Sequence, residues 1–304
     1  MKVREVEARS VLNRSGIPGA DYALNPYLGC GHGCVYCYAS FMKRFSGHDE
    51  AWGAFVDVKV NAPIVLARQL RRLQPAARQG AGGPPSGPGP APGPQVLVGT
   101  VTDGYQPVEA RYGVTRRCLE ELARADWLRV EILTKSDLVV RDLDLLRGRP
   151  GWDVGFTITT ASDEVSRLFE PGAAPSSRRF EAARALTRAG VGVWAFVGPA
   201  LPGVCDSLPE LSRLFWALAG SGVRRVLVDR FNPYPAARAR LLRVVRSRFP
   251  RALGPLVEAL REPEPYCRAL AEAAGIAARK AGLELEVCFD ADRPGRGTVE
   301  GVRR

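Results

Sequence analysis

Hydrophobic and polar positions along the chain alternate between two patterns. Short runs rich in valine, leucine, isoleucine and phenylalanine are typical of buried strands, and most are followed by about ten to fifteen residues with the spacing of an amphipathic helix. The predicted strands are 21–29, 54–60, 95–101, 129–135, 153–160, 190–199, 223–231 and 283–289. The predicted helices begin near Tyr38, span 61–73, 115–125 and 136–146, begin again at Asp163, Ser177 and Ser207, and recur two or three times before the last strand.

This alternation predicts an α/β fold in which helical crossovers connect the strands of a parallel sheet. Six strand–helix units precede the C-terminal helices, which favours a barrel or partial barrel over a five-stranded open sheet. In these architectures ligands bind where the strands end and the loops begin. Polar residues at the strand ends are therefore candidates for a functional site.

One segment differs from the rest in composition. Residues 75–94, PAARQGAGGPPSGPGPAPGP, contain almost no side chain that could join a core, which predicts a flexible surface insertion. The strand and helix patterns continue in the same order on both sides of it. We therefore expect residues 1–304 to form a single domain with this insertion, a core at about 22–232, and further helices and a strand over 236–290.

Composition and charge narrow the class of protein. Hydrophobic residues make up 46% and charged residues 25% of the chain, as in globular proteins. No apolar run approaches the length of a membrane span and the N-terminal residues lack an apolar signal segment, so we expect a cytoplasmic protein without a membrane partner. The net charge of +11 is compatible with nucleic acid as a partner. It does not require one, because arginines dispersed along a chain are also typical of a compositional bias.

Three of the seven cysteines, Cys30, Cys34 and Cys37, lie within eight positions of one another. The other four are scattered singly, so the cysteines do not resemble a disulfide framework, and the three together favour a metal or catalytic site. Gly31 and Gly33 lie between them, and glycine permits the tight backbone turns that bring three thiolates to one centre.

The spacing C-x3-C-x2-C fits two kinds of metal centre. A structural zinc ion needs a fourth protein ligand, and His32 lies too close to Cys34 in the sequence to bend toward the same metal without strain. A [4Fe–4S] cluster normally takes four thiolates, so three would leave one iron open for a ligand from outside the protein. These residues favour the cluster and leave a zinc site or a redox-sensing thiol loop as alternatives.

An aromatic residue, Tyr36, directly precedes the last cysteine, and CGHGCVYC resembles the signature of radical S-adenosylmethionine (radical SAM) enzymes. Further motifs resemble the spore photoproduct lyase-like group of that superfamily, over roughly residues 22–232. They are, in chain order, NPYLGCGHGCVYCYA, GTVTDGYQPVE, TRRCLEEL, ILTKSDLVVRDLDLL, ITT, LFEPGAAPSSRRFEAARALTRAG and PALPG.

The resemblance implies a partial (β/α)6 TIM-type barrel with a C-terminal helical extension. It implies that Cys30, Cys34 and Cys37 hold three irons of a [4Fe–4S] cluster, and that the fourth iron binds the amino and carboxylate groups of SAM. A reductant such as flavodoxin or ferredoxin would supply one electron, which cleaves SAM to methionine and a 5′-deoxyadenosyl radical. That radical would abstract a hydrogen atom from a substrate that the sequence does not identify.

Candidates for the SAM site lie at the strand ends. Hydroxyls and a carboxylate at Thr100, Thr102 and Asp103 would bind the ammonium or ribose of SAM, although Asp-Gly is also an ordinary turn signal. Thr157 and Thr159 share one face of their strand, which would be the ligand side of a barrel interior or an ordinary β-branched strand face.

Three more residues are candidates for the chemistry or for SAM binding. Only five of the 43 basic residues are lysine, so Lys135 at a strand end indicates a compact point charge, and the resemblance pairs it with the SAM carboxylate. The resemblance also places Tyr36 near the SAM adenine. Tyr38 is either an active-site aromatic residue or part of a helix core, and Cys205 is the extra thiol best placed for hydrogen-atom transfer.

One position departs from the spore photoproduct lyase. That lyase carries a hydrogen-donating cysteine two residues before its Ser/Thr–Asp pair, and Thr100 occupies this position here. Its DNA-repair activity therefore does not transfer to this chain. Two alternatives stay open: a radical SAM enzyme that modifies photoproducts or bases of DNA or RNA, and a non-enzymatic, zinc-containing nucleic-acid-binding protein.

Overall fold

A computed structural model of the chain describes residues 1–80 and 93–290. Its strands are β1 (Lys2–Val6), β2 (Leu12–Arg14), β3 (Tyr22–Leu24), β4 (Tyr27–Leu28), β5 (Phe55–Lys59), β6 (Gln95–Val98), β7 (Arg129–Thr134), β8 (Trp152–Thr157), β9 (Gly192–Ala200), β10 (Arg225–Arg230) and β11 (Glu284–Val287). Its helices are η1 (Tyr38–Phe45), α1 (Ala62–Gly80), α2 (Glu109–Tyr112), α3 (Val114–Leu122), η2 (Asp137–Asp142), α4 (Leu143–Leu146), α5 (Asp163–Phe169), α6 (Ser176–Arg188), α7 (Leu208–Ala219), α8 (Pro235–Arg248), η3 (Pro250–Ala252), α9 (Leu253–Arg261) and α10 (Pro263–Ala281).

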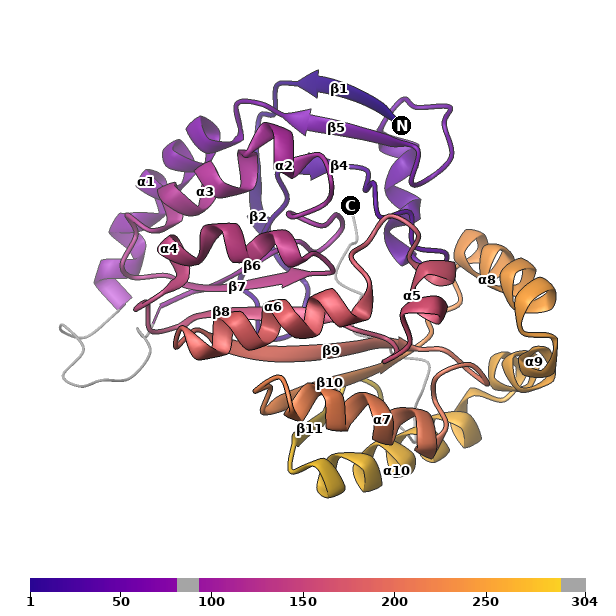
Figure 1. Cartoon of the computed structure of the whole chain (residues 1–304). Coiled ribbons are helices and arrows are strands. Elements are labelled where there is room, and N and C mark those ends of the chain that lie inside the picture. Colours follow the sequence, from indigo (N-terminus) through magenta and orange to yellow (C-terminus); the bar gives the residue numbers. More distant parts are fainter. Residues whose placement is uncertain (81–92, 291–304) are drawn as a thin grey trace.

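The main sheet has eight strands in the order β11-β10-β9-β8-β7-β6-β3-β2. Every neighbouring pair is parallel except β2 and β3. Because β2 and β11 lie at opposite edges, the parallel strands do not close into a barrel. This open, mixed α/β sheet confirms the predicted partial barrel (Figure 1).

A second sheet of three strands corrects the expected sheet membership. The predicted strand 21–29 is interrupted at Asn25 and Pro26, and proline has no N–H with which to continue a ladder. Its first part, β3, stays in the main sheet, whereas β4 pairs antiparallel with β5. The strand predicted at 54–60 is therefore formed as β5, but it lies outside the main sheet and pairs on its other side with β1. The residues of β1 alternate Lys, Val, Arg, Glu and Val, are mostly exposed and have no apolar run that predicts a strand.

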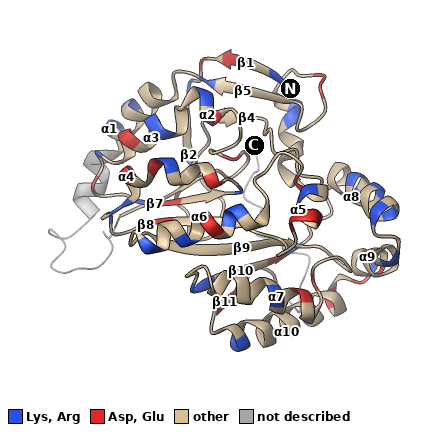
Figure 2. Cartoon of the chain, viewed as in Figure 1, with Lys and Arg blue, Asp and Glu red and all other residues tan. Residues whose placement is uncertain are grey.

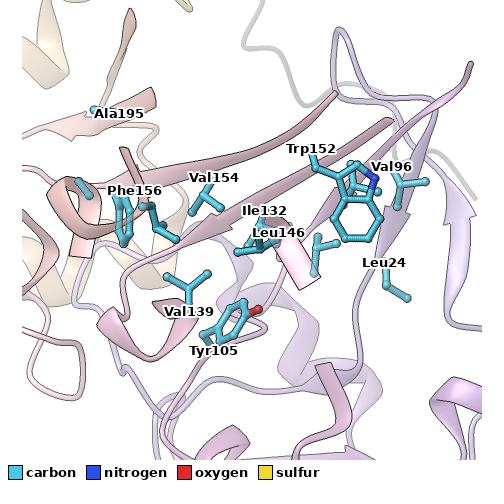
Figure 3. Packing of buried hydrophobic residues seen from close by; sticks show 14 of the residues in the cluster. Leu24, Val96, Tyr105, Ile132, Val139, Leu146, Trp152, Val154, Phe156 and Ala195 are labelled. Atoms are coloured by element: carbon cyan, nitrogen blue, oxygen red, sulfur yellow. The ribbon is translucent and has the colours of Figure 1, made fainter. Parts of the chain in front are cut away.

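The core lies between the main sheet and the helices that cover it. Figure 1 shows α3, α4, α6 and α7 crossing the same face of the sheet. Buried side chains from successive strands point into this layer and meet residues from the connecting loops and helices (Figure 3). The residues that Figure 3 labels are Leu24, Val96, Tyr105, Ile132, Val139, Leu146, Trp152, Val154, Phe156 and Ala195. The β7 strand alternates half-buried and buried positions, as the period-two pattern predicts.

Several helix predictions are confirmed with changed boundaries. The helix predicted at 136–146 forms as η2 and α4, and Ser136 caps it by accepting a hydrogen bond from the Leu138 N–H at 3.2 Å. The helix α1 runs past the predicted end at Leu73 and into the segment expected to be a flexible insertion. The rest of that insertion, residues 81–92, lies outside the described residues.

Charged side chains are distributed over most elements, and basic ones are dense on α8 (Figure 2). Among the helices that the structure describes, none has the length and hydropathy needed to cross a membrane.

Candidate active site

The three clustered cysteines lie in the cysteine loop (residues 30–37), which connects β4 to η1. Cys30 and Cys34 are buried and Cys37 is half-buried. Figure 1 shows the carboxyl ends of β9 and β10 directed toward the side of the molecule that carries α5 and α8. The loop therefore lies at the edge of the sheet where parallel α/β folds place their ligands.

Tight turns shape the backbone between the three cysteines. The Gly33 N–H donates to the Cys30 carbonyl at 3.2 Å, and the Cys37 N–H donates to the Cys34 carbonyl at 3.2 Å. Gly33 has a φ of +59°, a conformation that favours glycine. Gly31 has no positive φ, so the expectation that both glycines turn the backbone holds for Gly33 only. At Gly31 a Cβ would instead meet the Met1 sulfur at 3.0 Å.

The thiols influence one another electrostatically. Burial raises the pKa of Cys34 well above its usual range, and the neighbouring Glu170, Cys37 and Cys30 add to this while Lys135 opposes it. Burial and the nearby Cys30 raise the pKa of Cys37 to about 11. Cys30 differs because the adjacent imidazole outweighs burial and lowers its pKa. Three thiols that disfavour one another's charge in a site of low exposure are suited to a positively charged centre that compensates the thiolates.

That imidazole belongs to His32, which bridges Cys30 and Asp103. Its Nδ1 lies 3.3 Å from the Asp103 carboxylate, and the ring also hydrogen-bonds the Cys30 thiol. Burial disfavours the imidazolium, but Asp103 and Cys30 outweigh it and raise the pKa of His32 to about 9. Both ring contacts are therefore made within the chain, and the exclusion of His32 as a fourth metal ligand stays a prediction.

Asp103 organises the strand ends around this histidine. Its carboxylate accepts hydrogen bonds from the Thr134 hydroxyl at 2.8 Å and from the N–H groups of Tyr105 at 2.8 Å and Lys135 at 2.7 Å. Burial alone would raise the pKa of Asp103, but His32 and these donors lower it to about 2. The predicted Asp-Gly turn is thus formed, and SAM binding by Asp103 stays a prediction.

Tyr36 connects the loop to a buried ion pair. Its ring is buried, and its hydroxyl donates to the carboxylate of Glu170, which also pairs with Arg179. The side chains of both charged residues are 0% exposed. Burial works to raise the pKa of Glu170, but Arg179 and Lys135 hold it below its usual value. Arg179 further donates to the Thr157 carbonyl at 2.8 Å, so this network joins the loop to the end of β8.

The segment after α5 lies directly against the cysteine loop. The Val35 N–H donates to the Phe169 carbonyl at 2.8 Å, and the Gly172 N–H donates to the His32 carbonyl at 2.9 Å. A Cβ at position 172 would lie 2.1 Å from the Gly31 carbonyl oxygen. Only glycine permits this approach of the two backbones, so Gly172 sets the distance between the loop and α5.

Lys135 lies over the aromatic ring of the loop. Its Nζ is 5.8 Å from the centroid of Tyr36, within the range of a cation–π contact. Burial would lower the pKa of Lys135, but Cys34 and Glu170 outweigh it and raise the pKa. The ammonium group is therefore charged at neutral pH and close to the loop, and pairing with a SAM carboxylate stays a prediction.

Thr100 and Tyr38 meet at the end of β6. The Asn25 amide donates to the Thr100 hydroxyl at 2.9 Å and its oxygen accepts from the Thr100 N–H at 3.1 Å. The Tyr38 hydroxyl donates to the Thr100 carbonyl at 2.7 Å, and its ring lies 6.2 Å from that of Tyr234 between centroids. The structure thus brings Tyr38 to the same strand end as the SAM candidates and not into the main core.

The remaining predicted threonines are buried. The Thr102 hydroxyl donates to the Gly29 carbonyl at 2.6 Å and accepts from the Gln106 amide at 2.9 Å, which ties the loop to the turn after β6. Thr157 and Thr159 are both 2% exposed at the end of β8. Their contact with SAM stays a prediction.

Cys205 follows β9 and is far from the cysteine loop in the sequence. It belongs to the same hydrophobic cluster as Cys34 and Tyr36, together with residues of α8 and α9. Burial raises the pKa of its thiol to about 12, so the S–H bond is intact at neutral pH. Cys118 is buried in the main core, Cys267 is buried on α10, and Cys288 is half-buried.

Three residues at the site were not predicted from the sequence. Glu170 and Arg179 lie within a quoted motif, but a buried charge has no periodic signal. Arg240 of α8 donates to the carbonyls of Val35 at 3.0 Å and Cys37 at 3.1 Å. It is one of five arginines in that helix, and the pattern does not distinguish it from its exposed neighbours.

Comparison with known proteins decides the family. The profile of the radical SAM superfamily matches residues 24–214, which include the cysteine loop and the strands from β6 to β9. This chain belongs to the radical SAM superfamily. The match confirms the resemblance drawn from the cysteine motif, and it makes an enzyme the expected class of protein.

Two curated relatives of this radical SAM protein share the greater part of its length. A protein of Methanocaldococcus jannaschii is 30% identical over 206 residues, 68% of this chain and 70% of the relative. A protein of Mycobacterium tuberculosis is 31% identical over 234 residues, 74% of this chain and 63% of the relative. Both are named only as uncharacterized proteins.

Solved structures agree in fold. Spore photoproduct lyase complexed with a dinucleoside spore photoproduct superposes with a TM-score of 0.67 at 19% identity, covering 94% of this chain and 82% of the lyase. A variant of the lyase with bound AdoMet and the photoproduct superposes with a TM-score of 0.65 at 18% identity, covering 93% of this chain and 81% of the variant. Streptococcus suis SuiB bound to S-adenosylmethionine superposes with a TM-score of 0.54 at 11% identity, covering 87% of this chain and 46% of SuiB. The radical SAM protein therefore has the spore photoproduct lyase-like fold.

The superfamily implies a [4Fe–4S] cluster and SAM, and the cysteine loop fits the cluster. Within residues 1–80 and 93–290, no group of three or more His, Cys, Asp and Glu side chains is arranged to hold a single metal ion. A cubane cluster held by three thiolates leaves its fourth iron to a ligand from outside the protein, whereas a structural zinc ion needs four protein ligands on one atom. The loop offers three thiols and no fourth ligand, so it suits the cluster better than zinc.

Proposed function

We propose that this radical SAM protein uses a [4Fe–4S] cluster, held by Cys30, Cys34 and Cys37, to cleave SAM reductively and to abstract hydrogen from a substrate. Methionine and a 5′-deoxyadenosyl radical are what the cluster and SAM supply together when bound and reduced. The residues of this chain would hold the cluster, position SAM with Tyr36, Lys135 and the strand-end hydroxyls, and exclude water around the radical.

The observation that carries this proposal is the composition of the cysteine loop. Three thiols lie on one loop at the sheet edge, the adjacent His32 is engaged with Asp103 and Cys30, and the positive Lys135 lies beside the loop. One iron would then lack a protein ligand, as binding of SAM requires.

The direct test is anaerobic reconstitution with iron and sulfide. The protein should become brown and, with dithionite and SAM, release 5′-deoxyadenosine. Replacement of Cys30, Cys34 and Cys37 by alanine should abolish the colour and the product, while Cys288→Ala should change neither. Release of 5′-deoxyadenosine by the triple variant would contradict the proposal, as would stoichiometric zinc without iron, which is the result that the zinc-containing alternative predicts.

We further propose Cys205 as the hydrogen-atom donor to a substrate radical. Its protonated thiol shares a hydrophobic cluster with Cys34 and Tyr36, and Thr100 replaces the cysteine that the lyase uses. With a turning-over substrate, Cys205→Ala should still release 5′-deoxyadenosine but fail to return hydrogen to the product. Unchanged product formation would exclude this role.

A radical SAM enzyme that acts on a nucleic acid is the second candidate function. The net charge of +11 supports it, and the solved lyase with a similar fold holds a dinucleoside photoproduct. This alternative predicts binding of DNA or RNA that weakens steeply as salt rises, because counterions are released from phosphates. Binding that is insensitive to salt would count against it.

A further inference from the structure

The helix α8 carries a dense and uncompensated positive charge. Its sequence contains five arginines and no acidic residue. Four of them, Arg238, Arg243, Arg246 and Arg248, are exposed, and we call them the basic face of α8. Helical spacing places Arg243 and Arg246 opposite the buried residues of α8, with Arg238 beside them and Arg248 at the C-terminal end. Among the described residues, none of these four forms an ion pair. Figure 2 shows this face as a blue group at one end of the molecule.

The opposite side of α8 packs on the cysteine loop. Its buried residues Ala237, Leu241 and Val245 belong to the hydrophobic cluster that contains Cys34 and Tyr36. Between the two sides, Arg240 donates to the carbonyls of Val35 and Cys37. On this side of the molecule, α8 therefore lies between its basic face and the cysteine loop. Arg240 also connects the helix to the proposed cluster ligand Cys37 through a hydrogen bond to its carbonyl.

This position matters for the supply of electrons. A cluster held by the loop must receive one electron from outside the protein, and a short path favours entry where a single helix covers the ligands. Small side chains at Ala236 and Ala239, both exposed, leave room between the arginines for a partner to approach. A groove of about 440 Å³ lies here, lined by Ala239, Leu242, Arg243, Arg246 and Ser247.

We propose that the basic face of α8 is the docking surface for an acidic one-electron carrier protein of the flavodoxin or ferredoxin type. The inference rests on the proposed function, because it assigns the entry point of the electron that this function needs. The carrier loses one electron and the metal centre gains it, and no bond breaks. Complementary charge would steer the carrier to this face and weaken with salt.

The face is less suited to a polynucleotide. Proteins that bind single strands combine basic residues with aromatic rings on which bases stack, and α8 contains no aromatic residue. The exposed Phe45 on the adjacent η1 has the Arg44 guanidinium over its ring at 4.6 Å. A row of arginines over small side chains instead matches the carboxylate-rich surface of an acidic protein.

The test compares three proteins. Arg243→Glu/Arg246→Glu reverses the charge of the face, and Arg243→Gln/Arg246→Gln removes it with less disturbance of the helix. Arg71→Glu/Arg72→Glu makes the same charge change on α1, which lies on the opposite side of the molecule (Figure 1). Both control arginines are exposed, and neither pairs with a carboxylate in the part of the chain that the structure describes.

Two measurements separate docking from chemistry. The first is the affinity of the cluster-free proteins for flavodoxin by calorimetry. The second is the rate at which flavodoxin hydroquinone bleaches the visible absorbance of the reconstituted cluster at low salt. We expect the glutamate variant to lose about tenfold or more in affinity and rate, the glutamine variant less, and the α1 variant nothing, with differences that shrink as salt rises. The dithionite-driven release of 5′-deoxyadenosine should be equal in all of them.

Equal affinities and reduction rates in every variant would overturn the proposal. So would a variant that is reduced by flavodoxin at the unaltered rate but loses binding of an oligonucleotide, because the face would then serve a polynucleotide. Failure of dithionite to produce 5′-deoxyadenosine from the unaltered protein would reject the proposed function. The calorimetric measurement needs no cluster and would still test the surface.

Discussion

The buried pair of Glu170 and Arg179 shows how single residues define the site. Both side chains are 0% exposed, and the carboxylate also accepts from Tyr36. A buried ion pair contributes little net stability compared with an apolar pair, but loss of one partner leaves an uncompensated charge. Its consequence is geometric, because the carboxylate fixes the hydroxyl of Tyr36 and so orients this residue of the loop.

Neutralising the Glu170 carboxylate should therefore destabilise the folded protein. We expect Glu170→Gln to lower the free energy of unfolding of the cluster-free protein by about 3–5 kcal/mol in urea, because Arg179 stays buried without its partner. The double variant Glu170→Gln/Arg179→Met should lose less than the sum of the single variants. Glu164→Gln, at an exposed position of α5, the helix that ends just before Glu170, should change stability by less than about 0.5 kcal/mol. Additive losses would show that the pair is not coupled.

Asp229, at the end of β10, makes a prediction about pH. Burial raises its pKa to about 6, against an ordinary 3.8, and the Arg230 N–H and the Asn232 amide, which donate to its carboxylate, only partly oppose this. The folded state therefore holds its proton more tightly than the unfolded state does. The contribution of Asp229 to the free energy of unfolding should be complete below about pH 4 and fall by about 1–2 kcal/mol as the pH rises to about 6. Asp229→Asn should remove this fall and be more stable at pH 7, as urea unfolding between pH 4 and 7 would reveal. A fall of the same size in the variant would assign it to another group.

Elements far apart in the sequence enclose the cysteine loop. The last residue of α5 and the segment after it contact the loop through one backbone hydrogen bond each, and α8 contacts it through Arg240. Most strands and helices were predicted from their periodicity, whereas the three cysteines were singled out by their spacing. The small sheet was not, because β1 lacks an apolar run and β5 has the same pattern as a strand of the main sheet.

The contact between α5 and the loop can be tested at Gly172. A methyl group there would lie 2.1 Å from the Gly31 carbonyl oxygen, so Gly172→Ala must separate the two backbones. We expect a loss of about 2 kcal/mol or more in urea unfolding, and fewer irons bound per chain after reconstitution. Gly254→Ala is the matched control, because no atom lies within 4 Å of its added Cβ and alanine favours the helix α9. Normal iron content in Gly172→Ala would refute the proposed contact.

At the scale of the whole molecule, the buried residues form two hydrophobic clusters. The larger one fills the space between the main sheet and its helices. The smaller one joins the cysteine loop to α8 and α9. A ligand that binds only the folded state stabilises it, and the effect is greatest in the region it contacts.

Hydrogen exchange can distinguish the two clusters. Reconstitution with iron and sulfide should slow amide exchange in residues 30–37 and in α8 and α9, while β7, β8 and β9 should exchange slowly with and without iron. The physical reason is that the smaller cluster has fewer apolar contacts to hold it closed. Mass spectrometry of both forms would measure this. Equal slowing in the main sheet and in α8 would indicate a single cooperative unit.

The sequence by itself determined the alternation of strands and helices, the cysteine motif with its missing fourth ligand, and the superfamily to which these belong. Each of these depends on residues close together in the chain, where spacing and periodicity are visible. Only the tertiary structure decided that the sheet stays open, that β5 leaves it, and that Glu170, Arg179 and Arg240 surround the loop. Tyr36 and Glu170 are 134 residues apart, and a hydrogen bond over that separation depends on how the whole sheet and its helices pack. No local pattern encodes that packing.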